Sequence, residues 1–228
     1  MYMNIIDGFD KLTLLNYPDK VACTIFTKGC NFKCPYCHDS SLISLDKVND
    51  KYEEVISYLN KRKGILDGVC ITGGEPLIHK STKDLIIEIK NMGFLVKLDT
   101  NGSNPTMLKE LIDEKLIDYV AMDIKNTFDK YEMTICCKTN IDNIKRSIEI
   151  IENSNIDYEF RTTIVKELHT IDDIKGIVSM LNKKSKYYIQ NFRNSDGVLN
   201  KNLNGFTKEE LENLQKEIKN KNVYFRDL

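Results

Sequence analysis

The stretch 21–38, VACTIFTKGCNFKCPYCH, joins an apolar, β-branched run to a loop that carries three cysteines. The run from Val21 to Phe26 is typical of a buried strand, because such residues pack well on a pleated surface. Comparable runs recur along the chain at 68–72, 94–99, 119–124, 158–165 and 187–192, with a short seventh candidate at 223–226. The cysteines therefore directly follow the first of several predicted strands.

Segments with apolar residues at helical spacing separate these strands. The clearest contains Ile141, Ile144, Ile148 and Ile151, which fall on one face of a helix. Strands without polar alternation, separated by amphipathic helices, indicate a parallel sheet covered by helices and joined by right-handed crossovers. We therefore expect an α/β fold. Six such units are too few for a closed eight-stranded barrel, so the pattern fits either an open doubly wound sheet or an incomplete barrel.

The composition is that of an ordinary globular protein. Of 228 residues, 41% are apolar and 29% are charged, and the formal net charge is -1, so neither a disordered chain nor a basic nucleic-acid surface is indicated. Residues 1–10 lack the pattern of a secretory signal, and no apolar run approaches the ~20 residues that span a membrane. We expect a cytoplasmic protein with one domain, 1–228, in which an N-terminal arm or hairpin at 1–19 precedes a partial β/α barrel at 20–228.

Three of the seven cysteines, Cys30, Cys34 and Cys37, are separated by three and then two residues. In a reducing compartment such a group indicates metal ligands or reactive thiols more than disulfides. Three thiolates on one loop can hold a 4Fe-4S cluster and leave one iron without a protein ligand. A structural zinc is the alternative, with His38 as the nearest fourth ligand, although adjacent side chains rarely converge on one ion.

The triplet, with Tyr36 before its last cysteine, resembles the signature of the radical S-adenosylmethionine (SAM) superfamily. The resemblance implies an incomplete (β/α)6 barrel of parallel strands with outer helices. It also implies that Cys30, Cys34 and Cys37 hold a 4Fe-4S cluster whose open iron is chelated by SAM, and that Tyr36 contacts this cofactor. The reduced cluster would then cleave SAM to a 5'-deoxyadenosyl radical, while the protein supplies orientation and excludes competing reactions.

The second predicted strand ends in Gly73-Gly74-Glu75-Pro76. Paired glycines let backbone groups approach a ligand with no Cβ in the way. The sequence is similar to the superfamily's motif for the amino group of SAM, so the resemblance implies that Gly73, Gly74, Glu75 and Pro76 bind the cofactor.

Two acids, Asp99 and Asp123, stand at the ends of the third and fourth predicted strands. Buried acids are uncommon unless they are paired or metal-bound, so these two either cap helices, pair with Lys125 or bind a cation. Their segments resemble those of glycyl-radical-enzyme activases. The resemblance implies a site for a monovalent cation, Na or K, formed by Asp99, Thr100, the Ala121 carbonyl and Asp123.

The same resemblance assigns further residues to the cofactor. It implies that Lys125 has a catalytic role facing the cofactor or a substrate peptide, and that SAM is contacted by Asp99, Asn101, Asp123, Arg161 and Gln190. Arg161 suits a carboxylate, although a strand residue with its charged end at the surface is the alternative. We assign no chemistry to the remaining histidines and cysteines of interest: His79, His169, Cys23, Cys70, Cys136 and Cys137.

The opening segment 8–18, together with 99–103 and 122–125, resembles the longer type of anaerobic ribonucleoside-triphosphate reductase activating protein. The resemblance implies abstraction of a glycine Cα hydrogen in a separate reductase, with flavodoxin or ferredoxin as electron donor and no nucleic-acid or membrane partner. Alternatives are an activase of the pyruvate formate-lyase type and a small-molecule enzyme resembling 7-carboxy-7-deazaguanine synthase. A non-catalytic iron or zinc module, in which the triplet only braces a loop, is the alternative from another class.

Overall fold

The structure, a computed structural model, describes residues 5–219 and 221–226, and shows one sheet of eight strands in the order β1 to β8. β1 runs antiparallel to β2, and each later neighbouring pair is parallel. The strands are β1 Ile6–Thr13, β2 Ala22–Thr27, β3 Gly68–Gly73, β4 Leu95–Thr100, β5 Tyr119–Asp123, β6 Asp157–Ile164, β7 Tyr187–Asn191 and β8 Val223–Arg226. The predicted arm at 1–19 thus contains β1, and residues 1–4 of that arm lie outside the described residues.

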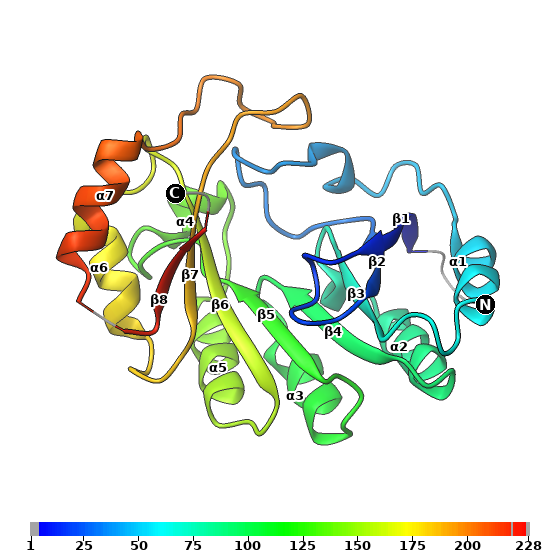
Figure 1. The fold of residues 1–228 in the computed structure, drawn as a ribbon. Coiled ribbons are helices and arrows are strands. Elements are labelled where there is room, and N and C mark those ends of the chain that lie inside the picture. The colour runs from blue at the N-terminus through cyan, green and yellow to red at the C-terminus, as the bar shows by residue number, and fades with distance from the viewer. Residues whose placement is uncertain (1–4, 220, 227–228) are drawn as a thin grey trace.

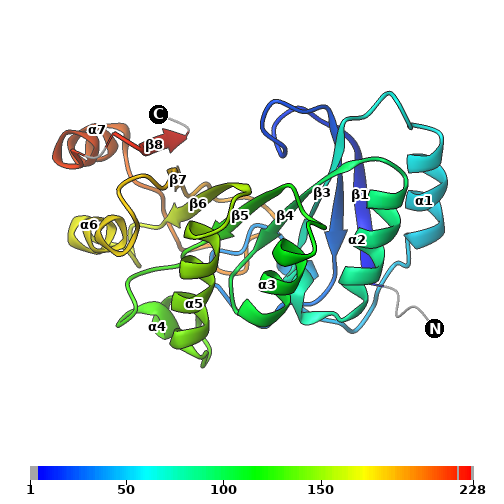
Figure 2. The same cartoon turned by 90° about the horizontal axis from the view of Figure 1, so that it is seen from below.

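The strand order decides between the two architectures that the sequence allowed. Each strand of the sheet lies next to its neighbour in sequence, whereas a doubly wound sheet reverses its order at a switch point. Figure 2 shows the strands as a curved arc with helices along its outer side. The incomplete barrel is therefore confirmed and the doubly wound alternative is wrong. The short candidate at 223–226 is confirmed as β8, which makes seven parallel strands rather than six.

Seven α-helices of the described chain connect these strands (Figure 1). They are α1 Tyr52–Asn60, α2 Ser81–Asn91, α3 Pro105–Asp113, α4 Tyr131–Ile135, α5 Ile141–Glu152, α6 Ile171–Met180 and α7 Lys208–Glu217. In α5, the predicted apolar face is buried at Ile144, Ile148 and Ile151, and the Asn140 side chain caps the first turn by accepting from the Asp142 amide. Burial of each of these three isoleucine side chains stabilises the fold by roughly 1.5–3 kcal/mol. No helix among the described residues has the length and apolar character to cross a membrane.

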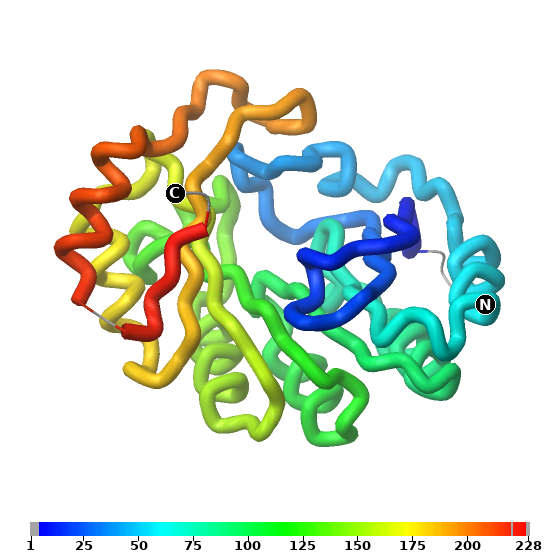
Figure 3. Tube along the Cα trace, in the orientation of Figure 1, coloured from blue at the N-terminus to red at the C-terminus, as the bar shows by residue number. Residues whose placement is uncertain are grey.

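Parallel strands bring their carboxyl ends to one edge of the sheet, and two loops meet above it. One is the cysteine loop, residues 28–38, after β2. The other is a segment between β7 and α7, residues 193–206, which we call the strap and which lies beside the cysteine loop in Figures 1 and 3. The Asn200 amide donates to the Pro35 carbonyl at 2.8 Å, and the Ser40 amide donates to the Gly197 carbonyl at 3.0 Å. The strap is therefore hydrogen-bonded to the cysteine loop at Pro35 and to the residues just after the loop at Ser40.

Candidate active site

A pocket of about 270 Å³ lies at the carboxyl edge of the sheet. The predicted site residues that line it are Cys30, Cys34, Tyr36, Cys37, Gly73, Gly74, Glu75, Asp99, Thr100, Asn101, Asp123, Lys125 and Arg161. The described lining does not include Pro76, Ala121 or Gln190. Gln190 is opposite the pocket residue Thr163 in the register of β7 and β6, one strand beyond the wall. The fold thus brings most of the predicted residues into one site.

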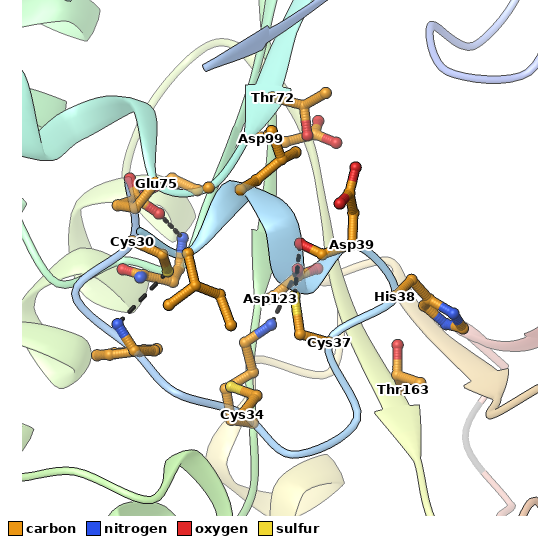
Figure 4. A pocket seen from close by; sticks show the side chains of 18 of the residues that line it. Cys30, Cys34, Cys37, His38, Asp39, Thr72, Glu75, Asp99, Asp123 and Thr163 are labelled. Carbon is orange, nitrogen blue, oxygen red and sulfur yellow. Dashed lines mark hydrogen bonds and ion pairs between the residues drawn. The ribbon is translucent and has the colours of Figure 1, made fainter. Parts of the chain in front are cut away.

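The three cysteines lie on one loop that curls around the pocket (Figure 4). Cys34 is buried, whereas Cys30 and Cys37 are half-buried. Burial raises the pKa of the Cys30 thiol to about 12 and that of Cys34 to about 11, while Lys125 acts in the opposite direction on both. Three thiols in a water-poor pocket are a donor set that fits an iron-sulfur cluster, since such clusters are held by cysteine thiolates. Binding would release the thiol protons.

A mononuclear metal site has different requirements. Across residues 5–219 and 221–226, no three His, Cys, Asp or Glu side chains are close enough together to hold one metal ion. A cubane cluster offers a separate iron to each thiolate, so its ligands need not converge on one point. His38 does line the pocket, but its ring stacks on Phe192 with 5.7 Å between centroids. The zinc alternative, in which His38 is a fourth ligand, gains no support from this geometry.

Backbone hydrogen bonds anchor the cysteine loop on both sides. The Cys30 amide donates to the Ile43 carbonyl at 3.0 Å, and the Lys33 amide donates to the Ile135 carbonyl at the end of α4, also at 3.0 Å. The Phe32 amide donates to the Cys30 sulfur at 3.4 Å. Such bonds fix the path of the loop in the absence of any ligand.

The paired glycines at the end of β3 are required by close contacts within the protein. Gly73 has φ +116°, a conformation that L side chains rarely adopt, and a Cβ there would lie 2.3 Å from the Thr27 nitrogen. A Cβ on Gly74 would lie 2.0 Å from the Gly29 carbonyl oxygen. The Glu75 amide donates to that same carbonyl at 2.8 Å. The close contacts that require glycine here are with β2 and the cysteine loop, and the predicted role of Gly73 and Gly74 in binding SAM stays a prediction.

The Glu75 side chain is buried and is held by three donors. The Thr100 hydroxyl and the Leu77 amide donate to Oε1 at 2.7 and 3.1 Å, and the Asn101 amide donates to Oε2 at 2.6 Å. Burial raises the pKa of Glu75 to about 7, although these hydrogen bonds act to lower it. Glu75 therefore ties the turn after β3 to the end of β4.

The opposite wall is built from charged side chains on strands. Arg161 of β6 bridges the two acids: its Nε donates to Asp123 at 2.8 Å and its Nη1 donates to Asp99 at 3.1 Å. Lys125 pairs with Asp123 at 3.1 Å, and the buried Lys97 pairs with Asp99. Of the alternatives for the two acids, the structure therefore shows pairing, and pairing with more partners than Lys125 alone.

The electrostatic balance follows from these pairs. Burial alone would raise the pKa of Asp99, but Arg161 and Lys97 bring the pKa below its ordinary value. Burial likewise opposes ionisation of Asp123, while Arg161 and Lys125 hold the pKa of that carboxyl well below its usual range. Both acids are thus ionised and compensated by protein cations. The Arg161 side chain is 14% exposed and its guanidinium pairs with both acids, so the alternative with its charged end at the surface is wrong.

Sequence reasoning missed several residues of this site. Thr163 lines the pocket and Lys97 pairs with Asp99. Side chains two apart on a strand share a face, so Arg161 could have placed Thr163 and Asp99 could have placed Lys97. No local signal identifies Asn31, whose side chain accepts from Asn101 at 2.9 Å across 70 residues of chain.

The chain matches known proteins over most of its length. Residues 24–181 match the radical SAM superfamily. The chain is 37% identical over 200 residues to a candidate glycyl-radical enzyme activating enzyme of Methanocaldococcus jannaschii, covering 84% of this chain and 81% of that protein. It is 26% identical over 206 residues to the pyruvate formate-lyase-activating enzyme of Clostridium pasteurianum, covering 87% of this chain and 81% of that enzyme.

The fold has a solved counterpart. Streptococcus suis SuiB bound to S-adenosylmethionine superposes with a TM-score of 0.67 at 14% identity, over 87% of this chain and 48% of SuiB. The chain therefore spans about half the length of that structure, and the likeness shows the fold alone. The match over residues 24–181 and the 37% identity to the archaeal relative establish that the chain belongs to the radical SAM superfamily and is an enzyme that generates radicals.

Proposed function

We propose that this enzyme is an activase that abstracts a glycine Cα hydrogen from a partner glycyl-radical enzyme. The observation that carries the proposal is the meeting of three thiols with the ends of β3, β4, β5 and β6 in one pocket. The similarity to activating enzymes over more than four fifths of the chain supports the glycyl-radical class. A module that only braces a loop would not need the charged wall opposite the thiols.

In this proposal, Cys30, Cys34 and Cys37 hold a 4Fe-4S cluster with one iron free of protein ligands. When bound and reduced, such a cluster would supply the electron that cleaves SAM to methionine and a 5'-deoxyadenosyl radical. The cysteine loop has its path fixed by backbone bonds on both sides, so the three thiols need little rearrangement on binding.

The rest of the pocket binds and orients SAM. Gly73, Gly74 and Glu75 line the same pocket as the thiols, and we assign the amino group of SAM to the backbone of this turn, residues 73–76. Lys125 and Arg161 are cations in the lining and suit a carboxylate. Apolar side chains, among them Phe26 and Phe32, form part of the same lining and exclude water from the reacting atoms.

A monovalent cation beside Asp99 and Asp123 stays a prediction. Each of the four carboxylate oxygens already pairs with Lys97, Arg161 or Lys125, so a Na or K ion would have to share an oxygen with one of these cations or displace it. Titrating SAM affinity against K and Na at constant ionic strength tests this point. An affinity that ignores both ions would reject the cation site and leave the activase proposal intact.

For the partner we propose anaerobic ribonucleoside-triphosphate reductase, on the resemblance of segments 8–18, 99–103 and 122–125. Flavodoxin or ferredoxin is the proposed electron donor. We further propose that residues 1–228 work as one domain, because the sheet runs without interruption from β1 to β8.

The test mixes the reduced, cluster-loaded chain with SAM and each candidate glycyl-radical enzyme of the same cell. The expected result is the glycine radical signal in electron paramagnetic resonance with the reductase, and its loss with Cys34→Ala. A radical on another glycyl-radical enzyme would reject the reductase as the partner and leave the activase proposal intact. SAM cleavage with no radical on any candidate would reject the activase proposal in favour of a small-molecule substrate.

A further inference from the structure

Three polar side chains close a ring of hydrogen bonds between the cysteine loop and the loop after β4. The Asn101 Nδ2 donates to the Asn31 Oδ1, the Asn31 Nδ2 donates to the Ser103 Oγ, and the Ser103 amide donates back to the Asn101 Oδ1. All three distances are 2.9 Å. We call Asn31, Asn101 and Ser103 the amide clasp.

The side-chain carbonyl and NH2 groups of both asparagines form hydrogen bonds within the clasp. Asn101 is 6% exposed and lines the pocket, yet its carbonyl and its NH2 group each have a protein partner. Asn31 likewise accepts through Oδ1 and donates through Nδ2. An amide side chain can donate through its NH2 group and accept through its carbonyl oxygen at the same time.

The clasp is rooted in rigid parts of the fold. The Asn101 backbone amide donates to the buried Glu75, and the Asn143 side chain of α5 donates to the Ser103 carbonyl at 3.1 Å. On the other face of the loop, the Cys137 sulfur donates to the Asn31 carbonyl at 3.5 Å. Asn31 is therefore held from two sides, and it is adjacent in sequence to Cys30.

We propose that the amide clasp positions the first turn of the cysteine loop, and with it Cys30 and Cys34, before the cluster binds. Asn31 and Asn101 are positioning residues in this account: they act through the loop rather than on SAM. The inference rests on the proposed role of the cysteines as cluster ligands, but its first test uses the metal-free chain. Groups that orient metal ligands change metal affinity by roughly 10- to 100-fold when they are removed.

The test compares Asn31→Leu, which has a similar size and no hydrogen-bonding groups, with Asn60→Leu on α1. Asn60 is a matched control because its side chain is exposed and bonds only to the Ile56 carbonyl of its own helix. Hydrogen exchange of the metal-free protein should be roughly five- to tenfold faster at the amides of 29–34 in Asn31→Leu, and unchanged there in Asn60→Leu. Unaltered exchange at 29–34 would overturn the proposal whatever the chain's activity.

Two further measurements separate positioning from general stability. Asn31→Asp can accept from Asn101 and from a reoriented Ser103 hydroxyl, so it should restore slow exchange at 29–34 in the metal-free protein. In the reconstituted full chain, Asn31→Leu should lose iron to a chelator roughly tenfold faster than Asn60→Leu. If Asn31→Leu instead lowers protection evenly across the whole fold, the clasp is a stability element and the positioning role is rejected. Normal exchange at 29–34 in Asn31→Leu rejects the clasp whether or not the glycine radical forms, whereas an unmutated chain that gives no glycine radical rejects the activase proposal and leaves the exchange result standing.

Discussion

The two walls of the pocket differ in backbone structure and in charge. The cysteine loop presents three thiols on irregular backbone, and burial raises the pKa of each. The loop is held by main-chain hydrogen bonds and the amide clasp. The facing wall presents Asp99, Asp123 and Arg161 on regular strands, where the charges already neutralise one another. The first wall therefore depends on an added group for its chemistry, whereas the second is complete within the protein.

This difference predicts how each wall responds to substitution. Changes on the cysteine wall should abolish cofactor chemistry and leave the fold standing. Changes on the charged wall should reduce the free energy of unfolding first, because a buried charge that loses its partner is costly. Four substitutions, taken from the largest effect to the smallest, test that division.

Cys34→Ala should remove a cluster ligand and reduce SAM cleavage below detection, while the metal-free protein stays folded. Iron content and 5'-deoxyadenosine formation measure the effect. Cys23→Ala is the matched control, because Cys23 is fully buried on β2 and is not in the described lining of the pocket. Cys23→Ala should keep iron and activity at a modest loss of stability. Normal turnover by Cys34→Ala would contradict the role of the cysteines as cluster ligands.

Arg161→Met should lower the free energy of unfolding of the metal-free chain by about 3 kcal/mol, because Asp99 and Asp123 lose their shared partner. Lys109→Met breaks an exposed pair with Asp113 and should change it by roughly 0.5 kcal/mol or less. Urea unfolding of both variants gives the comparison. Equal effects would mean that the charged wall is no more than a surface ion pair.

Glu75 lies between the two walls, and Glu75→Gln should make the free energy of unfolding depend less on pH. The folded-state pKa of Glu75 is raised to about 7 by burial, above its ordinary value near 4.5. Its contribution is therefore fully present below about pH 4.5 and is lost as the pH rises through about 7, by roughly 1–3 kcal/mol. The free energy of unfolding should fall less from pH 5 to pH 8 in Glu75→Gln than in the unmutated chain. An identical pH difference in wild type and Glu75→Gln would show that Glu75 does not titrate in this range.

Gly197→Ala tests the strap and should have the smallest effect, about 1 kcal/mol. A Cβ at Gly197 would lie 2.1 Å from the His38 carbonyl oxygen, so the strap must shift from the cysteine loop. Hydrogen exchange near Ser40 and in 195–200 should quicken. Gly8→Ala is the control, since a Cβ there meets no atom within 4 Å. If both alanines behave alike, the strap does not hold the loop.

The same contrast explains what the sequence could predict. The strands and the cysteine spacing are local patterns, and the predicted parallel sheet and incomplete barrel are confirmed. The charged wall depends on register: Asp123 meets Arg161 because β5 pairs with β6 at that residue, 38 positions away. The strap reaches the cysteine loop across 165 residues, between Pro35 and Asn200. Nothing in a local window predicts such contacts.

The most direct test of the central claim is electron paramagnetic resonance of the reduced, cluster-loaded full chain with and without SAM. If three cysteines leave one iron open to the cofactor, the spectrum of the cluster should change when SAM is added, and Cys34→Ala should give no such spectrum. A reduced cluster whose spectrum is the same with and without SAM would contradict the account.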